Sequence, residues 1–115
     1  VVYRFDDAIL FFNADYFKMR LLDTVQRESQ PEVVLFDAEA VTDIDVSGIA
    51  VLREIRETLA AQGIYFAIAR ARGTFLAMLE RSGMTREMDS QLLFGSVRSG
   101  IRTYRIWRNS MRGKQ

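Results

Sequence analysis

The segment Asp45-Val46-Ser47-Gly48 carries the residue types from which a chemical role is most directly argued. It lies between an apolar run and a stretch with helical periodicity, so its polar side chains are expected at a helix start. Asp45 and Ser47 can each accept a hydrogen bond from a free backbone N–H group there, and capping is the commoner role of such residues. The positive end of the helix dipole would also favour a phosphate on the Ser47 hydroxyl. The segment predicts a helix cap, with Ser47 as the candidate phosphoacceptor.

Gly48 adds a steric feature to the same segment. Because glycine has no Cβ atom, we expect it to let a ligand or a partner chain approach the helix start closely. A phosphate on Ser47 would add about −1.5 to −2 charges at one spot, which is enough to disturb a docked partner. Asp45, Ser47 and Gly48 together are therefore the predicted binding residues at this helix N-terminus.

Four carboxylates, Asp37, Glu39, Asp43 and Asp45, are predicted near the end of one strand. They could form a Mg²⁺ site or an acid/base pair, but loop solvation and helix capping explain them more simply. The chain has no His and no Cys, which removes Cys/His zinc sites, thiolate nucleophiles and Ser-His-Asp triads. Its glycines are too scattered for a phosphate-binding loop. We therefore predict no catalytic residue, no metal site and no cofactor.

Aromatic residues are concentrated between positions 11 and 17. Phe11 and Phe12 are predicted in a strand, where alternation would place them on opposite faces of the sheet. Most of these side chains are expected in the core, but some are expected to mark an exposed docking surface. The candidate docking residues are Phe12, Asn13 and Tyr16.

The overall charge excludes one class of partner. The chain has 16 basic and 15 acidic residues, so it is not built to hold a polyanion, and nucleic acid is not expected. Between Arg98 and Gln115, however, the sequence has Arg and Lys but no Asp or Glu. That basic end predicts either a solvated helix face or contact with acidic lipid headgroups.

The elements that position these residues alternate along a chain of 115 residues, the size of one domain. Strands alternating with helices predict an α/β fold with a largely parallel sheet, and the first two strands are expected to form an antiparallel hairpin. No apolar run approaches the roughly 18–20 residues that span a bilayer. Because the first residue is Val and already belongs to a strand, we expect a piece of a longer protein. Strands are predicted at 1–5, 9–12, 33–36, 64–69 and a short edge strand at Met84; helices are predicted at about 13–28, 47–62, 73–82 and from Val97 onward.

Two stretches resemble one known family. Asp45-Val46-Ser47-Gly48-Ile49 resembles the Asp-Ser-Ser-Gly-type signature of STAS domains, which in anti-anti-sigma factors carries the serine phosphorylated by the anti-sigma kinase. Ser47 falls on that serine, whereas Val46 replaces the usual polar residue. The run from Ile9 to Phe17 resembles the one typical of STAS domains attached to SulP anion permeases. The resemblance covers nearly the whole chain.

The resemblance implies a fold and an organisation. It implies a mixed, mostly parallel sheet of roughly four to five strands with about four helices mainly on one face. Residues 1–115 would form one STAS domain, of which 108–115 is a frayed basic tail.

The resemblance also implies a function. The chain would be a non-catalytic regulatory and protein-interaction domain of a SulP-type anion (sulfate) transporter, on the cytoplasmic side of the inner membrane. Its partners would be the transmembrane domain of its own transporter and a regulatory protein such as acyl carrier protein or an anti-sigma kinase. Nucleotide binding enters only through the family, and homo-oligomer formation is left open. The alternative is a stand-alone anti-sigma-factor antagonist switched by phosphorylation of Ser47.

Overall fold

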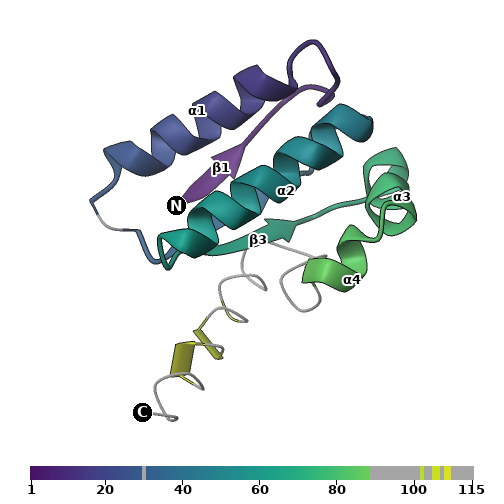
Figure 1. Ribbon diagram of the computed structural model, residues 1–115. Coiled ribbons are helices and arrows are strands. Elements are labelled where there is room, and N and C mark those ends of the chain that lie inside the picture. The colour runs from purple at the N-terminus through teal and green to yellow at the C-terminus, as the bar shows by residue number, and fades with distance from the viewer. Residues whose placement is uncertain (30, 89–101, 103–104, 107, 110–115) are drawn as a thin grey trace.

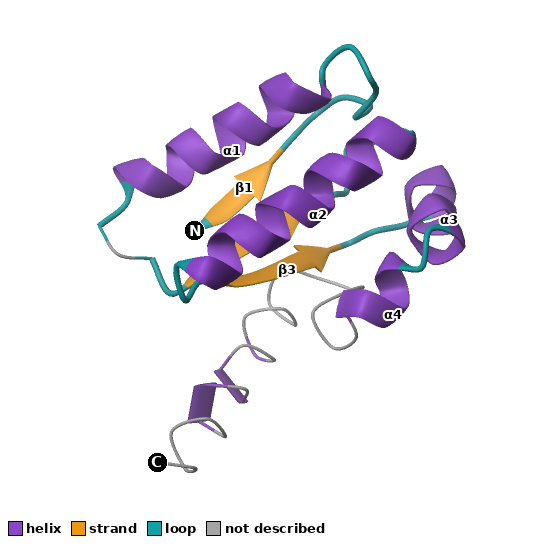
Figure 2. Ribbon diagram, in the orientation of Figure 1, coloured by secondary structure: helices purple, strands orange, loops and turns teal. Residues whose placement is uncertain are grey.

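The computed structural model describes residues 1–29, 31–88, 102, 105–106 and 108–109. Strands and helices alternate through most of this part of the chain (Figures 1 and 2). The elements are β1 (Val2–Arg4), α1 (Ala14–Arg27), β2 (Val33–Asp37), α2 (Val46–Ala61), β3 (Tyr65–Ala69), α3 (Gly73–Arg81) and α4 (Met84–Met88). The described residues between 102 and 109 are also helical.

The three described strands form one parallel sheet in the order β1-β2-β3. Val2 pairs with Leu35 across the first junction, and Phe36 pairs with Ile68 across the second. The central strand β2 is flanked on both sides and is almost entirely buried, which explains its unbroken apolar run. The predicted α/β fold with a mostly parallel sheet is confirmed.

Helices α1 and α2 lie side by side over one face of the sheet (Figure 1). Their buried residues recur at helical spacing because only one stripe of each helix faces the strands. Phe17 of α1 packs against Phe36 of β2, with ring centroids 5.1 Å apart. The core on this face also includes Leu21, Leu52, Ile55, Leu59, Val34, Phe66 and Ile68.

The predicted opening hairpin is wrong. β1 pairs in parallel with β2, and Ile9 makes only one isolated bridge, also parallel, with Ile44. The residues after Ile9 turn instead of extending, and Phe11 and Phe12 lie in that turn. Within the described residues the sheet therefore has no antiparallel pair.

The predicted edge strand at Met84 is also wrong, because Met84 begins the short helix α4. Gly83 has φ +85°, which lets the chain turn sharply between α3 and α4, and its carbonyl accepts the N–H groups of Arg86 and Glu87. Most of the predicted last helix, and residues 110–115 of the predicted frayed tail, lie outside the described residues.

None of the described helices combines the length and the apolar character needed to cross a membrane.

Candidate functional site

The predicted site residues meet at the edge of the sheet where the parallel strands end. Helices α1 and α2 both begin at this edge, and the loop from β1 to α1 rises above it (Figure 1). Ligands and partners of α/β sheets usually bind at the carboxyl ends of the strands. The predicted site residues therefore lie at the edge where a ligand or partner of such a sheet would bind.

Asp45 is the N-cap of α2, as predicted, and it also makes a contact that the sequence did not suggest. Its Oδ1 atom accepts a hydrogen bond from the Gly48 N–H group at 2.9 Å. Its Oδ2 atom accepts a second bond, at 2.8 Å, from the N–H group of Phe11. One carboxylate thus joins the start of α2 to the turn that precedes α1.

Backbone contacts reinforce this junction. The N–H group of Ile9 donates to the Asp43 carbonyl at 2.9 Å, and the N–H group of Asp45 donates to the Ile9 carbonyl at 3.2 Å. Gly48 packs directly beneath them, because a Cβ atom built there would lie 2.4 Å from the Ile9 carbonyl oxygen and 2.5 Å from Ile44 Cγ1. The absent side chain at position 48 makes room for the chain's own backbone.

The expectation that Gly48 is an open point of approach is therefore wrong, because this residue is buried. Its neighbours Val46 and Ser47 remain accessible: Val46 is 79% exposed and Ser47 is partly exposed. Ser47 is the second residue of α2, so its hydroxyl lies at the positive end of the helix dipole while Asp45 caps the helix.

The acidic cluster divides into separate contacts. The Arg70 guanidinium donates from Nε to Asp37 Oδ1 at 3.0 Å and also pairs with Glu39. The Arg70 hydrogen bond is the main cause that lowers the pKa of Asp37, helped by the backbone N–H group of Glu39 and opposed by burial. A carboxylate held ionised in this way is a poor acid at neutral pH. Among residues 1–29 and 31–88, no group of three or more acidic side chains is arranged to hold a metal ion.

Arg70 reaches these carboxylates from a costly backbone conformation. Its φ is +59°, in the left-handed region that residues with a Cβ atom seldom adopt. The ion pairs with Asp37 and Glu39 compensate for that cost. No local pattern predicted this contact, because Asp37 and Arg70 are 33 residues apart.

The segment Leu10–Asn13, which we call the aromatic turn, presents two rings to solvent. Phe11 is 76% exposed and Phe12 is 68% exposed, so the expected alternation between two faces does not occur. Asn13 closes the turn: its Oδ1 atom accepts the Leu10 N–H group at 2.7 Å, and its Nδ2 atom donates to the Ala8 carbonyl at 2.8 Å. Asn13 is thus occupied inside the turn, whereas Phe12 and the exposed Tyr16 face solvent.

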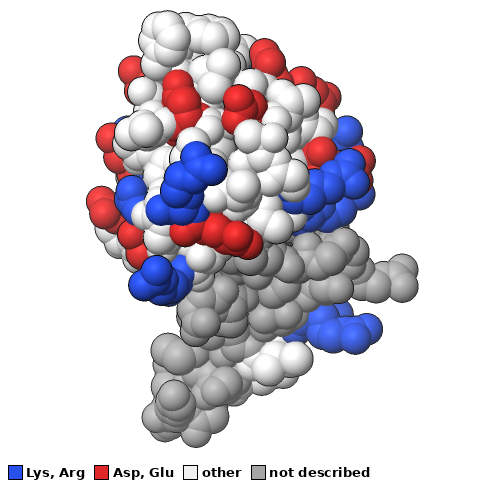
Figure 3. Space-filling model, turned by 90° about the vertical axis from the view of Figure 1, so that its right-hand side faces the viewer, with Lys and Arg blue, Asp and Glu red and all other residues white. Residues whose placement is uncertain are grey.

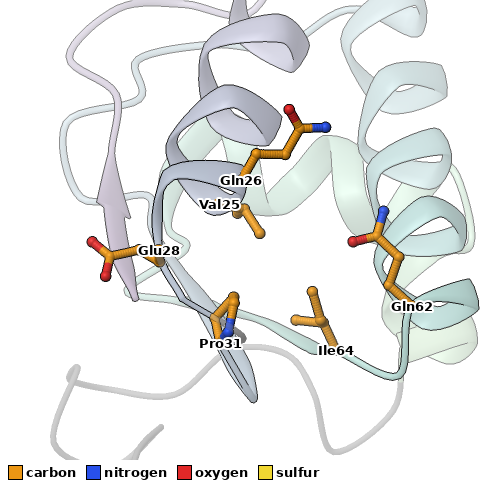
Figure 4. A pocket seen from close by; sticks show the side chains of 6 residues that line it. All are labelled: Val25, Gln26, Glu28, Pro31, Gln62 and Ile64. Carbon is orange, nitrogen blue, oxygen red and sulfur yellow. The ribbon is translucent and has the colours of Figure 1, made fainter.

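A cavity of about 460 Å³ lies at the opposite end of the sheet, between the ends of α1 and α2 (Figure 4). Its side chains come from both helix ends and from the segments that lead into β2 and β3. It is lined by Val25, Gln26, Glu28, Pro31, Gln62 and Ile64. No predicted site residue borders it.

Comparison with known proteins agrees with the fold and with the resemblance to STAS domains. The family model of the STAS domain matches residues 1–100. A probable sulfate transporter of Mycobacterium tuberculosis is 27% identical over 106 residues, which are 91% of this chain and 19% of that protein. High affinity sulfate transporter 2 of Stylosanthes hamata is 30% identical over 113 residues, 90% of this chain and 17% of that protein. The chain thus spans less than a fifth of the length of these curated relatives.

Solved structures share the fold. A sulfate transporter family protein from Wolinella succinogenes superposes with a TM-score of 0.76 at 20% identity, covering 91% of this chain and 84% of that one. The STAS domain of a SulP transporter from Vibrio cholerae gives 0.71 at 17% identity, with 95% and 83% covered. A putative anti-sigma factor antagonist from Thermotoga maritima gives 0.74 at 16% identity, with 90% and 87% covered.

Proposed function

The chain belongs to the STAS-domain family, and from that premise we propose that it is a non-catalytic regulatory and interaction domain of a SulP-type anion transporter. Its curated relatives include sulfate transporters, of which it matches 17–19% of the length. The rest of such a transporter would form the membrane part that selects and moves the anion, sulfate or a related one. In this arrangement the domain lies on the cytoplasmic side of the inner membrane.

One observation carries this proposal: the aromatic turn is exposed, yet it is fixed to the start of α2 by the Asp45 carboxylate. Apolar rings held in a defined position at the surface suit the binding of a partner. Two carboxylates near them are occupied: Asp45 accepts two backbone N–H groups, and Asp37 is paired with Arg70, which makes these two groups unsuited to acid/base catalysis. The transmembrane domain of the same transporter is the expected partner, with a soluble regulator as a further one.

Transport measurements on the full-length protein test this function. We would express it intact, with residues 1–115 deleted, and with the conservative control Glu57→Gln on the exposed side of α2. Sulfate uptake would be normalised to the amount of transporter in the membrane. The deletion is expected to change the uptake rate, whereas Glu57→Gln leaves it unaltered. Equal uptake with and without the domain, or a gene without membrane-spanning segments, would contradict the proposal.

A second candidate function is a stand-alone anti-sigma-factor antagonist switched at Ser47. It is favoured by the position of Ser47, which is partly exposed at the second residue of α2 while Asp45 satisfies the cap. Phosphotransfer from a cognate kinase would be compared for wild type, Ser47→Ala and Thr42→Ala, a nearby exposed hydroxyl. Labelling is expected to disappear only in Ser47→Ala, and unchanged labelling there would exclude Ser47.

Ser47→Asp sharpens the same test. A negative charge in the first turn of α2 is favourable to the helix dipole, so the melting temperature should change little. The added charge would face a bound partner and is expected to weaken its binding. Global unfolding of this variant in a circular dichroism melt would count against the switch.

A further inference from the structure

The largest exposed apolar side chains near the site gather where α1 and α2 begin. Phe11 and Phe12 touch edge to face, with ring centroids 5.6 Å apart. Tyr16 is 57% exposed and Met19 is 68% exposed, and their spacing places them on one side of α1. The hydrogen bond from Phe11 to Asp45 brings Val46 to the same edge. We call these five residues the apolar patch.

The apolar patch is held in position. The Asn13 side chain, at the end of the turn, bonds to the Leu10 N–H group and the Ala8 carbonyl at its start, and Asp45 fixes the Phe11 N–H group across 34 residues of sequence. Binding to a surface that is already ordered loses less conformational entropy than binding to a mobile loop. Such exposed and fixed rings indicate a binding surface rather than an accidental display of apolar groups.

The surroundings of the patch are acidic. Asp7, Asp15 and Asp43 are exposed at this edge, and none of them forms an ion pair with another described residue. Arg4, the last residue of β1, and Arg70, which follows β3, are already paired with carboxylates. Figure 3 shows the top of the molecule, where the loop from β1 to α1 lies, as an uncharged surface with acidic residues below it. The exception is Arg20, whose Cζ atom lies 5.9 Å from the centroid of the Tyr16 ring, so the acidic surroundings belong to the Phe11–Phe12 end of the patch. An occupant of that end would be apolar and carry positive charge.

We propose that the apolar patch docks a basic loop of the transporter's own membrane part, together with the apolar residues that flank this loop. This inference rests on the proposed function. Cytoplasmic loops of membrane proteins carry an excess of Lys and Arg and join apolar spans, which is the chemistry that this edge complements. Lys and Arg can also lie over the exposed phenylalanine rings. An anionic lipid surface or a nucleic acid would meet the unpaired carboxylates and be repelled.

Site-directed photo-cross-linking in the full-length transporter tests the occupant. A benzoylphenylalanine would replace Phe12 and, as the control, Ile106, which is 64% exposed in the last helix. From position 12 we expect cross-links that mass spectrometry maps to a Lys- or Arg-containing loop of the membrane part. Their yield should fall as NaCl rises from about 0.05 M to about 0.5 M, because salt screens exposed charges. Position 106 should not give this product.

Reversing the acidic charges beside the patch is the second test of the proposed occupant. Asp15→Lys combined with Asp43→Lys is expected to lower the cross-link yield from position 12 by about fivefold. The melting temperature should fall modestly, because Asp15 lies in the first turn of α1 and Asp43 Oδ1 accepts the Ile44 N–H group, so the yield is compared below the melting temperature of the variant. Glu57→Lys is the matched control, because it reverses an exposed charge on α2 and should keep the yield.

The other outcomes overturn the docking surface. Cross-links to a second copy of this chain, to lipid or to a soluble protein would replace the membrane loop as the occupant. A yield no higher than that from position 106 would remove the docking site altogether. If any of these results appears while deletion of the domain still alters uptake, the regulatory function stands and only the docking surface fails. Unaltered uptake after deletion would count against the function itself.

Discussion

The two ends of the sheet are stabilised in different ways. At the carboxyl end, side chains fix distant segments: Asp45 bonds to the Phe11 N–H group at 2.8 Å, and Arg70 bonds to Asp37 at 3.0 Å. At the amino end, the described contacts between distant segments are mainly backbone bonds, together with an exposed ion pair of Arg108 with Glu32 at 3.2 Å. The backbone nitrogen of Val1 donates to the Val33 carbonyl, and the Tyr65 N–H group donates to the Glu32 carbonyl, both at 3.0 Å.

The two ends of the sheet also differ in how far their apolar side chains are exposed. Val25 and Ile64 line the cavity at the amino end and are at most 9% exposed. Phe11 and Phe12 at the carboxyl end are mostly exposed, although burying a phenylalanine is worth about 1.5–3 kcal/mol. At the amino end, apolar side chains are therefore buried in the core. At the carboxyl end, specific hydrogen bonds hold exposed apolar side chains in place. This contrast is what a docking surface requires, and it can be tested residue by residue.

The largest expected change in the free energy of unfolding is at Gly48, and Gly63 at the other end of the sheet is the comparison. Gly48→Ala places a Cβ atom against the Ile9 carbonyl and should lower the free energy of unfolding by about 3 kcal/mol. Gly63→Ala has open space around the new atom but keeps φ +74°, and should cost about 1 kcal/mol. Urea denaturation followed by circular dichroism measures both. Equal costs would mean that the close packing of α2 against Ile9 is not rigid.

Asp45 gives the next effect, because it serves two segments. Asp45→Ala removes the helix cap and the acceptor of the Phe11 N–H group, and should cost about 2 kcal/mol. Asp45→Asn keeps one acceptor oxygen and should cost about 1 kcal/mol. Amide hydrogen exchange should become faster at Phe11 in Asp45→Ala, whereas Tyr65 at the amino end keeps its protection. Slow exchange at Phe11 in that variant would show that the aromatic turn does not depend on Asp45.

The elements that the sequence predicted well are those with local signals. The strands β2 and β3 are unbroken apolar runs, and α2 has a capping residue at one end and Gln62-Gly63 at the other. The hairpin failed because the apolar sequence from Ile9 to Phe12 looks like a strand, while its pairing partner, Ile44, is remote in the sequence. The five-residue helix α4 is too short to show a helical period.

The same distinction applies to the site. The capping role of Asp45 follows from its local sequence, since a polar residue before a helix start is a familiar pattern. Its second bond, to Phe11, spans 34 residues and has no local signal. The burial of Gly48 likewise depends on Ile9, which only the folded chain brings near. Residue types predicted the edge of the sheet, but the contacts that shape this edge are tertiary.

A pH-dependent effect should distinguish the ion pair at the carboxyl end. Arg70 lowers the pKa of Asp37 below the value of about 3.9 expected in the unfolded chain. The pair therefore contributes stability above that pH and loses it as the pH falls through the folded-state pKa. Arg70→Gln should be less stable than wild type at pH 7, with the difference shrinking in acid. Urea titrations between about pH 2 and pH 7 measure it.

Two controls keep this result specific to Asp37. Because Arg70 also pairs with Glu39, the comparison is repeated in a Glu39→Gln background. The pKa of Glu87 is also lowered, chiefly by its hydrogen bonds from Arg53, and this second pair is intact in Arg70→Gln. Its contribution to acid unfolding is thus common to both proteins and cancels from their difference. A difference between wild type and Arg70→Gln that stays constant with pH would show that Asp37 is not the titrating partner.

The smallest expected change in the free energy of unfolding tests most directly whether the apolar side chains of the aromatic turn are exposed. Phe12→Ser should change the free energy of unfolding by no more than about 0.5 kcal/mol, because the ring has little buried surface to lose. Val25→Ala removes fewer carbon atoms than Phe12→Ser does. It should nevertheless lower the free energy of unfolding by about 2 kcal/mol, because Val25 is only 3% exposed beside the cavity. Urea denaturation compares the two. If Phe12→Ser proved as destabilising as Val25→Ala, the phenylalanine ring would belong to the core, and no partner would be needed to explain its place in the aromatic turn.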